Sequence, residues 1–567
     1  MSRLAELQQQ LLDEDIILTI KADVIFPRVG GYAARPYINE LDLYETPRPS
    51  ELKALWRWWM RVTLSGLYGG SKYYDELDKE VSKILGSTEK TSYFTIMVDL
   101  PAEAEDTLKD IKRKAHMIRT LLTNIIPKIF KRFVIQWSEK YSHSARIRYI
   151  SLSIPVSIRF SKVKYRFFKK LAKELFGQDI PPKKKEIKVV IKTSNTLKML
   201  IKKLNINLNI KSDDELKSIL DIYDELVNIA KIPRMSILLQ PRRENGENDR
   251  FVNELSEENR KYLQRISEDL IIPKRMPFEI IVTRNREIGD NTEFRFAITT
   301  LLLSLILGGI GSITRRGFGS IVIKEVEIGD NYKENLKEEL TLIEKILNAS
   351  NSNELERALN GYIKHIINLG RKTFSVSQRD PQLPEVPSLI PDSDYFRLKV
   401  LEFKDDIIEI LKDFGRASLK SEWKKIVYGN KATRKTGGAL HTWILGLPRQ
   451  AKYKERGKEI YTGYFIDDQP GRRPSAISLK IFESKQSKKF IIVYGFLSKD
   501  WPLNKLVHRS KLYPSGKKVK ELDLHSLRRL YNKRYTRRYT REMSDEEFLR
   551  EVFNTAFEFI LQILESS

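Results

Sequence analysis

The chain has 567 residues, more than one hydrophobic core usually holds, so several domains are expected. It carries 101 Lys and Arg against 75 Asp and Glu, a formal net charge of +26, and it contains no Cys. The absence of Cys excludes disulfides, thiolate zinc sites and cysteine nucleophiles. The positive charge favours a polyanionic partner, foremost nucleic acid, although 31% charged residues are also typical of an ion-pair-rich thermophilic surface.

Neither a signal peptide nor a membrane span is expected. Residues 1–15 are polar and acidic, without the apolar core of a signal peptide. The longest apolar run, near residues 298–310, is shorter than the roughly 20 residues that a membrane span needs. The sequence therefore predicts a soluble cytoplasmic protein with no membrane partner.

The first predicted elements are a strand over 16–26 and a helix over 50–67, with Ser50 as the expected N-cap. The loop between them is rich in Gly and Pro and carries Arg28 and Arg35.

Trp56 and Trp59 lie on the apolar face of this helix and are expected in the core. Trp58 lies off that face, so it either stacks on a base or a partner or belongs to the core. Three basic side chains recur every four residues and form a ridge on the helix: Lys53, Arg57 and Arg61.

The next predicted elements are a strand over 93–100, a helix over 103–126 and a long strand over 146–160. A lysine-rich stretch at about 161–275, with a helix over 213–230, is interpreted as an insertion within one domain.

A strand over 278–284 and a buried helix over 294–307 lead into a glycine-rich loop, residues 308–320, which a strand over 320–328 follows. Glycine tolerates positive φ and close backbone approach, and neighbouring arginines suit phosphate. The candidate phosphate clamp consists of Gly309, Gly311, Arg315, Arg316 and Gly317. The alternative is a tight helix-to-strand connection with solvated arginines. Neither a Walker loop nor a G-x-G-x-x-G pattern is present.

The element order of residues 1–330 is compatible with a split βαβ, ferredoxin-like sheet, and the pattern partly repeats in 331–567. We therefore expect an α+β fold.

The second half is expected to contain two helices (332–348 and 353–369), a strand over 395–403, a helix over 414–428, paired strands over 476–483 and 490–497, and a last helix over 544–564 capped by Ser544. Its loops bring further phosphate-suited residues: Arg434, Lys435, His441, Arg472 and Arg473.

A basic segment, residues 498–541, has fourteen Lys and Arg against three Asp and Glu, with tyrosines interleaved. This composition suits single-stranded nucleic acid, and the alternative is a solvated basic helix face.

Several motifs resemble a known family. The loop GGIGSITRRGFGS resembles the glycine-rich loop of the RAMP superfamily of CRISPR-associated proteins. The stretches ETPRPSELKALWRWWMRV, RKTGGALHTWILGLPR and RRPSAISLKIF resemble the subunit-one family of the type III-B Cmr effector complex. Residues 161–275 and parts of 331–400 match nothing recognisable in that family.

The resemblance implies two RAMP modules of ferredoxin-like (RRM-like) type with helical insertions, one in 1–330 and one in 331–567. It also implies a non-catalytic subunit that binds CRISPR RNA near its 3′ end, the 5′ region of target RNA, and other Cmr subunits, without cofactor or metal. The first RNA-binding candidates are Lys53, Arg57, Trp58, Arg61, Gly309, Gly311, Arg315, Arg316 and Gly317. A second group is Arg28, Arg35, Arg434, Lys435, His441, Arg472 and Arg473.

Two other classes remain open. Some RAMP proteins are metal-independent endoribonucleases that use histidine, and His441 would then be the catalytic residue acting on CRISPR RNA. An aspartate such as Asp23 or Asp42 could instead serve metal-dependent cleavage, but neither has a partner carboxylate at useful spacing. The other class, besides these two enzymatic options, is a purely structural subunit, which would bind RNA only weakly and without sequence dependence.

Overall fold

A computed structural model gives an α+β structure with antiparallel sheets, as predicted. The described residues form two compact units: those up to 101 and from 275 onwards make the first, and those from 102 to 274 the second. The structure describes residues 16–26, 47–126, 128–129, 132, 146–151, 157–161, 186–191, 193–206, 212–232, 274–285, 291–311, 314–377, 379–404, 406–428, 441–447, 449–455, 458–466, 473–501, 503–511, 519–522 and 543–566.

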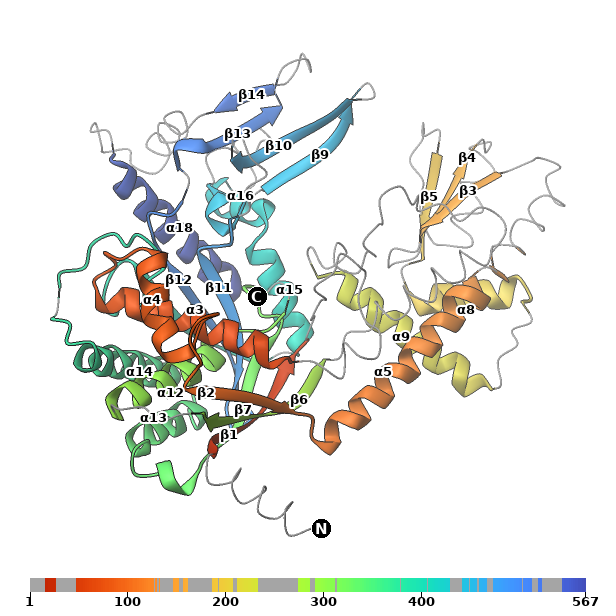
Figure 1. Ribbon diagram of the computed structural model, residues 1–567. Coiled ribbons are helices and arrows are strands. Elements are labelled where there is room, and N and C mark those ends of the chain that lie inside the picture. Colours follow the sequence, from red (N-terminus) through yellow and green to blue (C-terminus); the bar gives the residue numbers. More distant parts are fainter. Residues whose placement is uncertain are drawn as a thin grey trace, which may run out of the picture. The chain divides into compact units, whose positions relative to one another are not determined.

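The first unit contains a four-stranded antiparallel sheet in the order β2-β6-β1-β7 (Figure 1). Its strands are β1 (Ile16–Ile25), β2 (Phe94–Asp99), β6 (Arg275–Arg284) and β7 (Ser320–Ile328). Strands β2 and β6 pair directly, with Asp99 opposite Glu279. The alternating apolar residues of β1 enter one core with helices α3 (Pro49–Leu67) and α12 (Asn291–Leu307). The predicted strands and helices of this region are confirmed.

The N-cap of helix α3 lies two residues earlier than the sequence suggests. The N-cap is Arg48 rather than the predicted Ser50, and Pro49 follows at the first helical position, where the missing N–H of proline has no partner to lose. The Glu51 carboxylate accepts a hydrogen bond from the Arg48 N–H at 3.4 Å. Trp56 and Trp59 are fully buried, as predicted, and the Trp56 indole donates to the Ala297 carbonyl at 3.0 Å.

A second sheet of the first unit has the order β11-β12-β8, from strands Ile477–Glu483, Lys489–Phe496 and Phe396–Phe403. The predicted helix over 414–428 is wrong as a single element: α15 (Ile407–Ala417) ends and α16 (Lys420–Tyr428) begins after a break. The last helix, α18 (Asp545–Glu565), starts at Ser544, whose hydroxyl accepts from the Glu547 N–H, as predicted.

A further sheet, β14-β13-β10-β9, was not predicted. Its strands are Val519–Leu522, Leu506–Lys511, Lys458–Ile466 and Arg449–Glu455. Two of these strands fall in the basic segment 498–541, where an exposed helix face was one expectation. The residues 523–541 lie outside the described part of the chain.

The second unit holds α5 (Ala102–Thr120), which continues as a π-helical turn over Leu121–Ile125, α8 (Ser194–Lys203), α9 (Asp213–Ala230) and the sheet β3-β4-β5. The predicted helix over 213–230 is confirmed. The predicted long strand over 146–160 is wrong, because β3 (Arg146–Ser151) and β4 (Ser157–Ser161) pair antiparallel, with β5 (Glu186–Val190) beside β4. The alternation of side chains continues through the reversal, so periodicity did not reveal it.

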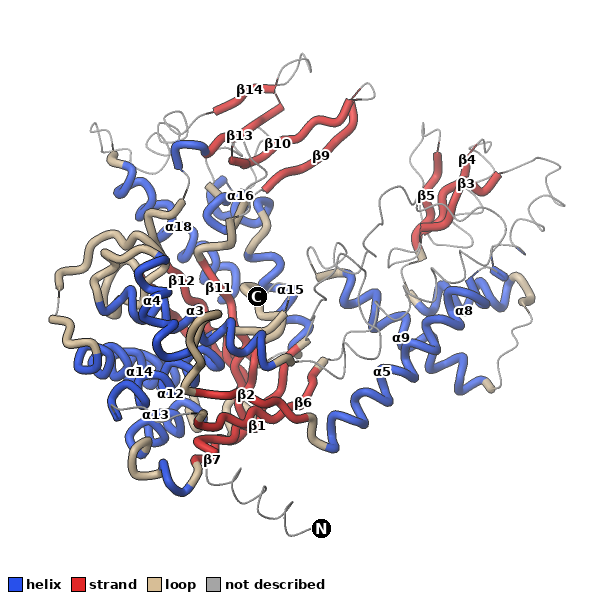
Figure 2. Tube along the Cα trace, in the orientation of Figure 1, coloured by secondary structure: helices blue, strands red, loops and turns tan. Residues whose placement is uncertain are grey.

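Helices α12, α13 (Lys337–Leu347) and α14 (Ser352–Thr373) pack against one another in the first unit (Figure 2). Helix α4 (Tyr74–Leu85) follows α3 and packs on it. No helix in the described residues is both long and apolar enough to cross a bilayer.

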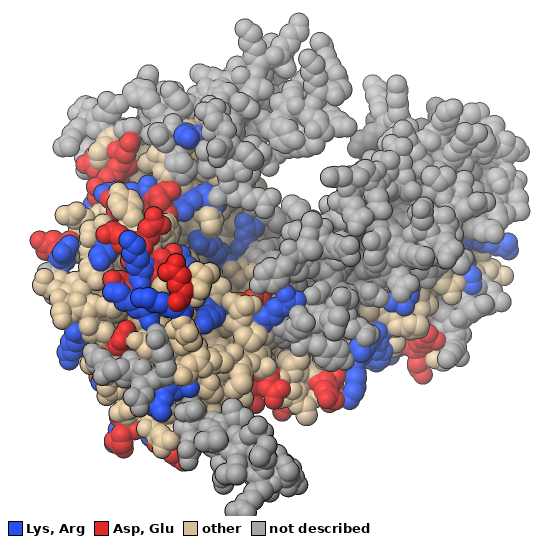
Figure 3. Space-filling model, viewed as in Figure 1, with Lys and Arg blue, Asp and Glu red and all other residues tan. Residues whose placement is uncertain are grey.

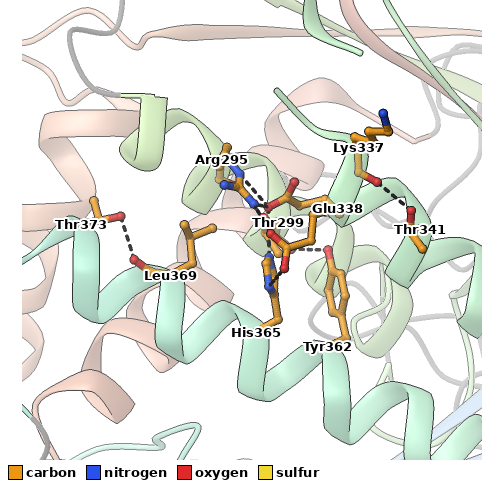
Figure 4. Close-up of polar contacts among 10 residues, drawn as sticks. Arg295, Thr299, Lys337, Glu338, Thr341, Tyr362, His365, Leu369 and Thr373 are labelled. Atoms are coloured by element: carbon orange, nitrogen blue, oxygen red, sulfur yellow. Dashed lines mark hydrogen bonds and ion pairs between the residues drawn. The ribbon is translucent and has the colours of Figure 1, made fainter. Parts of the chain in front are cut away.

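A charged group joins the three helices (Figure 4). The Arg295 side chain donates to Glu339 at 2.7 and 2.9 Å and to Glu338 at 2.6 Å. The His365 ring lies 3.0 Å from Glu339 and 3.3 Å from Glu338. Burial raises the pKa of Glu339, but hydrogen bonds from His365 and Arg295 bring that pKa below its usual value. The buried carboxylate thus contacts Arg295 of α12 and His365 of α14.

Replacing Glu339 by Gln should lower the free energy of unfolding by about 3 kcal/mol, because it removes a buried charge from paired partners. Glu338→Gln is the matched control: its side chain is 61% exposed, and the expected loss is at most about 1 kcal/mol. Denaturant unfolding of the full chain measures both. Equal midpoints for the two variants would show that the buried charge does not hold these helices together.

Candidate nucleic-acid interface

The glycine-rich loop is a tight connection between α12 and β7. The Ile310 N–H donates to the Gly319 carbonyl at 2.9 Å, and the Gly319 N–H donates to the Ile25 carbonyl at 2.7 Å. Gly311, Gly317 and Gly319 have φ of 84°, 82° and 64°, a region that favours glycine. A Cβ at Gly317 would lie 2.5 Å from the Phe414 ring. The loop glycines are therefore required by backbone conformation and by packing against the second half of the chain.

The loop arginines are engaged within the protein. The Arg315 guanidinium donates to the Ser475 carbonyl and lies over the Trp58 ring, 5.9 Å from its centroid. Burial lowers the pKa of Arg315. Arg316 is half-buried, and its backbone bridges to Leu479 of β11. Arg315 therefore links the first half of the chain to the second, in addition to any role toward a ligand.

Trp58 is half-buried and packs edge-on against two other aromatic rings. The ring centroids lie 5.2 Å from Trp59 and 5.9 Å from Phe496. With the Arg315 guanidinium over its ring, Trp58 adjoins the core while keeping part of its surface exposed. Its stacking on a base stays a prediction.

The three residues of the basic ridge on α3 differ in their contacts, and two of them bind neighbouring residues of the protein. Arg57 donates to the Gly86 carbonyl at 2.5 Å and to the Ser82 hydroxyl at 3.0 Å. Arg61 lies 3.2 Å from the Asp78 carboxylate. These two arginines tie α3 to α4 and to the residue that ends it. Figure 3 shows Lys and Arg mixed with Asp and Glu over α3 and α4.

Lys53 differs from its neighbours on the ridge, because no hydrogen bond or ion pair joins it to any described residue. Its side chain is half-buried, and its pKa is lowered by burial and by the nearby charge of Arg57. Partial removal from water and a neighbouring positive charge both disfavour the charged form of a lysine, and a nearby anion would offset them. Lys53 is therefore the ridge residue most available to an anion.

Arg473 comes from the second half and was a second-group candidate. Its guanidinium is paired with Asp500 and lies over the Trp501 ring, 5.0 Å from the centroid. The charge of Arg473 contributes to the lowered pKa of Arg315, so the two arginines are neighbours. The structure thus brings Trp58, Arg315 and Arg473 together.

Other predicted residues lie outside the described part of the chain: Arg28, Arg35, Asp42, Arg434, Lys435 and Arg472. The sequence reasoning missed Tyr73 and Tyr74, which are 61% and 37% exposed at the start of α4. The composition of that stretch, YGGSKYY, combines glycines, a lysine and tyrosines and could have indicated them.

His441 is buried, with 2% of its surface exposed. The Trp443 indole donates to its Nδ1 at 3.3 Å, and the ring packs edge-on against Phe548. Burial, with smaller contributions from His508 and Lys420, lowers the pKa of His441 to about 3. A general acid or base works best with a pKa near the operating pH. This environment does not suit His441 to that role.

Asp23 is buried between two cations, with Lys324 at 2.9 Å and Arg275 at 3.3 Å. Its charge is therefore balanced by the chain itself. Glu338, Glu339 and His365 place potential metal-ligand atoms within 4.8 Å of one another. Arg295 already donates to both carboxylates, so it supplies the positive charge there.

Gly317→Ala should lower the free energy of unfolding by at least about 1–2 kcal/mol, because a side chain is disfavoured at its φ and would meet Phe414. Gly361→Ala is the matched control: Gly361 lies within α14, and its Cβ would meet no atom within 4 Å. This control should stabilise the protein by about 0.5–1 kcal/mol. Thermal and denaturant unfolding test both, and a neutral Gly317→Ala would contradict the packing argument.

Stability should fall as the pH drops from 6.5 toward 3, because His441 and His508 both have a pKa near 3 when folded and near 6.5 ordinarily. The unfolded chain then binds more protons than the folded chain, at roughly 1.4 kcal/mol per pH unit for each histidine. Unfolding of the His508→Gln variant between pH 7 and 4 should show a shallower pH dependence. A His508→Gln curve identical to that of the unaltered protein would refute this.

Comparisons with known proteins bear on these observations. Residues 48–322, from the cap of α3 into β7, match the family model described as the RAMP superfamily. The protein named CRISPR system CMR subunit Cmr1 from Saccharolobus solfataricus (strain P2) is 26% identical over 329 residues, 56% of each chain. The alignment thus spans little more than half the length of that relative.

A chain in the solved structure described as the cryo-EM structure of the Type III-B Cmr-beta bound to cognate target RNA is also similar. The TM-score is 0.50 at 17% identity, covering 97% of this chain and 100% of that one. At this identity the similarity concerns the fold. Residues 48–322, a little under half of the chain, thus match the RAMP superfamily model, and the chain is similar to the protein named CRISPR system CMR subunit Cmr1.

Proposed function

We propose that this protein is a non-catalytic RNA-binding subunit of a type III-B CRISPR Cmr ribonucleoprotein complex in antiviral defence. Its partners would be the 3′ region of the CRISPR RNA, the 5′ region of the target RNA, and other Cmr subunits. The RAMP match, the relative named Cmr1 and the fold shared with a chain of an RNA-bound Cmr structure support this proposal.

The single observation that carries RNA binding is the environment of Lys53. This cation is partly withdrawn from water beside Arg57, and no described carboxylate pairs with it. A phosphate would supply the missing negative charge. The net charge of +26 would draw a polyanion toward such a site.

We also propose two ferredoxin-like modules, in residues 1–330 and 331–567, with an insertion at about 161–275. In the first module the chain order is β1, α3, β2, β6, α12, β7, and the sheet order is β2-β6-β1-β7. This order supports a split βαβ sheet for the first module. In the second, β8, β11 and β12 form a sheet with β12 central, and α18 follows them.

The alternative function, a metal-independent endoribonuclease acting through His441, has less support. The buried ring and its pKa near 3 would make proton transfer at neutral pH unfavourable. A binding role needs no such proton transfer. We therefore favour RNA binding without cleavage.

Titration of the full chain into labelled single-stranded RNA at several salt concentrations tests this function. The logarithm of the affinity should fall linearly with the logarithm of the salt concentration, at a slope near −0.7 per phosphate contact. Lys53→Ala should weaken binding and make the slope shallower by about 0.7. Lys83→Ala, which removes the same charge from a lysine paired with Glu80 at 2.8 Å, is the matched control and should leave the slope unchanged.

The RNA is then run on a denaturing gel after incubation with magnesium or EDTA. Intact RNA with steep salt dependence is the expected result. Binding without salt dependence would contradict a phosphate-binding function. Discrete products that disappear in a His441→Ala variant would make the protein an endoribonuclease.

A further inference from the structure

Arg315 and Arg473 lie at the boundary between the two halves of the first unit: the Arg315 guanidinium donates to the carbonyl of Ser475, two residues along the chain from Arg473, and the charge of Arg473 helps to lower the pKa of Arg315. One carboxylate, Asp500, is paired with Arg473. Arg315 has no carboxylate partner among the described residues: its hydrogen bond goes to the Ser475 carbonyl. Two guanidiniums with one carboxylate leave a positive charge in a partly desolvated place.

Two buried donors at this boundary have no acceptor among the described residues. They are the Nε atom of Arg473 and the indole Nε1 of Trp501, and Trp501 is only 4% exposed. An unsatisfied buried donor is destabilising and requires an explanation. A ligand whose oxygen atoms accept these hydrogen bonds would explain why the two donors lack an acceptor in the protein alone.

Exposed aromatic rings stand beside these donors. The Tyr74 hydroxyl donates to Asp500 at 3.4 Å, and the charges of Asp500 and Arg473 both affect the pKa of Tyr74, which burial raises. Tyr73 precedes it and is 61% exposed.

The turn that carries these rings is fixed by backbone contacts. The Gly70 N–H donates to the Ser65 carbonyl at 2.8 Å, and the Glu385 N–H donates to the Gly70 carbonyl at 2.9 Å. A rigid support lowers the entropy lost when a ring binds a partner.

We infer that this boundary holds a subsite for one nucleotide of a single-stranded nucleic acid. Arg315 and Arg473 bind the phosphate, and the ring of Tyr73 or Tyr74 stacks on the base. The inference rests on the proposed RNA-binding function and specifies where one nucleotide sits. A base has a π-face whatever its identity, so the subsite tolerates any sequence.

The arrangement of charge gives the nucleotide an orientation. Asp75 and Glu76 occupy the first turn of α4, so the end of the turn near Tyr73 is acidic. A phosphate is repelled there and attracted to the arginine pair. The base carries no charge, so the acidic residues near Tyr73 do not repel it, and it can lie beside the tyrosine rings.

Variants of the full chain test the subsite with labelled single-stranded RNA and with an RNA of the same length that carries abasic sugars. Tyr73→Ala combined with Tyr74→Ala should weaken binding of the ordinary RNA by about 5- to 150-fold, the range for one stacked base. This loss should vanish with the abasic RNA. Arg473→Ala should weaken binding of both RNAs, because it removes a phosphate contact.

Met97→Ala is the matched control, since Met97 is an exposed apolar side chain on β2 away from the turn. Its affinity should equal that of the unaltered protein. Thermal unfolding of every variant identifies loss of folding. Where Arg473→Ala proves unstable, Arg473→Gln, which removes the charge but keeps most of the side-chain volume, takes its place. A photocrosslink from RNA containing 5-iodouridine, mapped by mass spectrometry, should fall on Tyr73 or Tyr74.

The subsite is wrong if the double tyrosine variant binds both RNAs as tightly as the unaltered protein and no crosslink maps to the turn. In that case, salt-dependent RNA binding that is lost in the Lys53→Ala variant would still support the proposed function. If the unaltered protein shows no salt-dependent RNA binding, both fail together. A tyrosine variant that binds RNA normally but no longer assembles with a purified Cmr subunit would make the turn a protein interface instead.

Discussion

The contact between the glycine-rich loop and strand β11 is the constraint on which the first unit depends. The Leu479 N–H donates to the Arg315 carbonyl at 3.1 Å, and the Ile481 N–H donates to the Ser320 hydroxyl at 3.1 Å. Between them the buried Lys480 amino group donates to the Gly308 carbonyl and to the Leu305 carbonyl at 3.2 Å, at the end of α12, and burial lowers the pKa of Lys480 well below its usual value. Three successive residues of one half thus bind the loop of the other.

This constraint divides the basic residues into two groups. Arg57, Arg61 and Arg315 have partners inside the protein, so each contributes to architecture whether or not RNA is present. Lys53 has none among the described residues and is therefore the clearest candidate for a purely ligand-binding role. A high positive charge alone does not distinguish these roles, since only tertiary contacts show which cations already have an acceptor.

Sequence patterns predicted most elements of the first unit because α12 is apolar on all sides, β1 alternates, and α18 carries its own cap. Sequence patterns failed where the contact that fixes a residue's role is made with a residue distant in sequence. Nothing in the periodicity of α3 indicates that Arg57 will reach Gly86, and nothing near Gly317 indicates Phe414. For the site, residue types were foreseeable, whereas the meeting of Arg315 with Arg473 and the exposure of Tyr73 required the fold.

The pairing of β2 with β6 has a consequence for the second unit. The chain leaves the sheet at Asp99 and returns on the adjacent strand, where Glu279 stands opposite. In topological terms all residues between these strands form the loop of one β-hairpin, however long that loop is. Loop length adds little to closure entropy, so this position can gain, lose or exchange a whole unit while the register of the sheet stays the same.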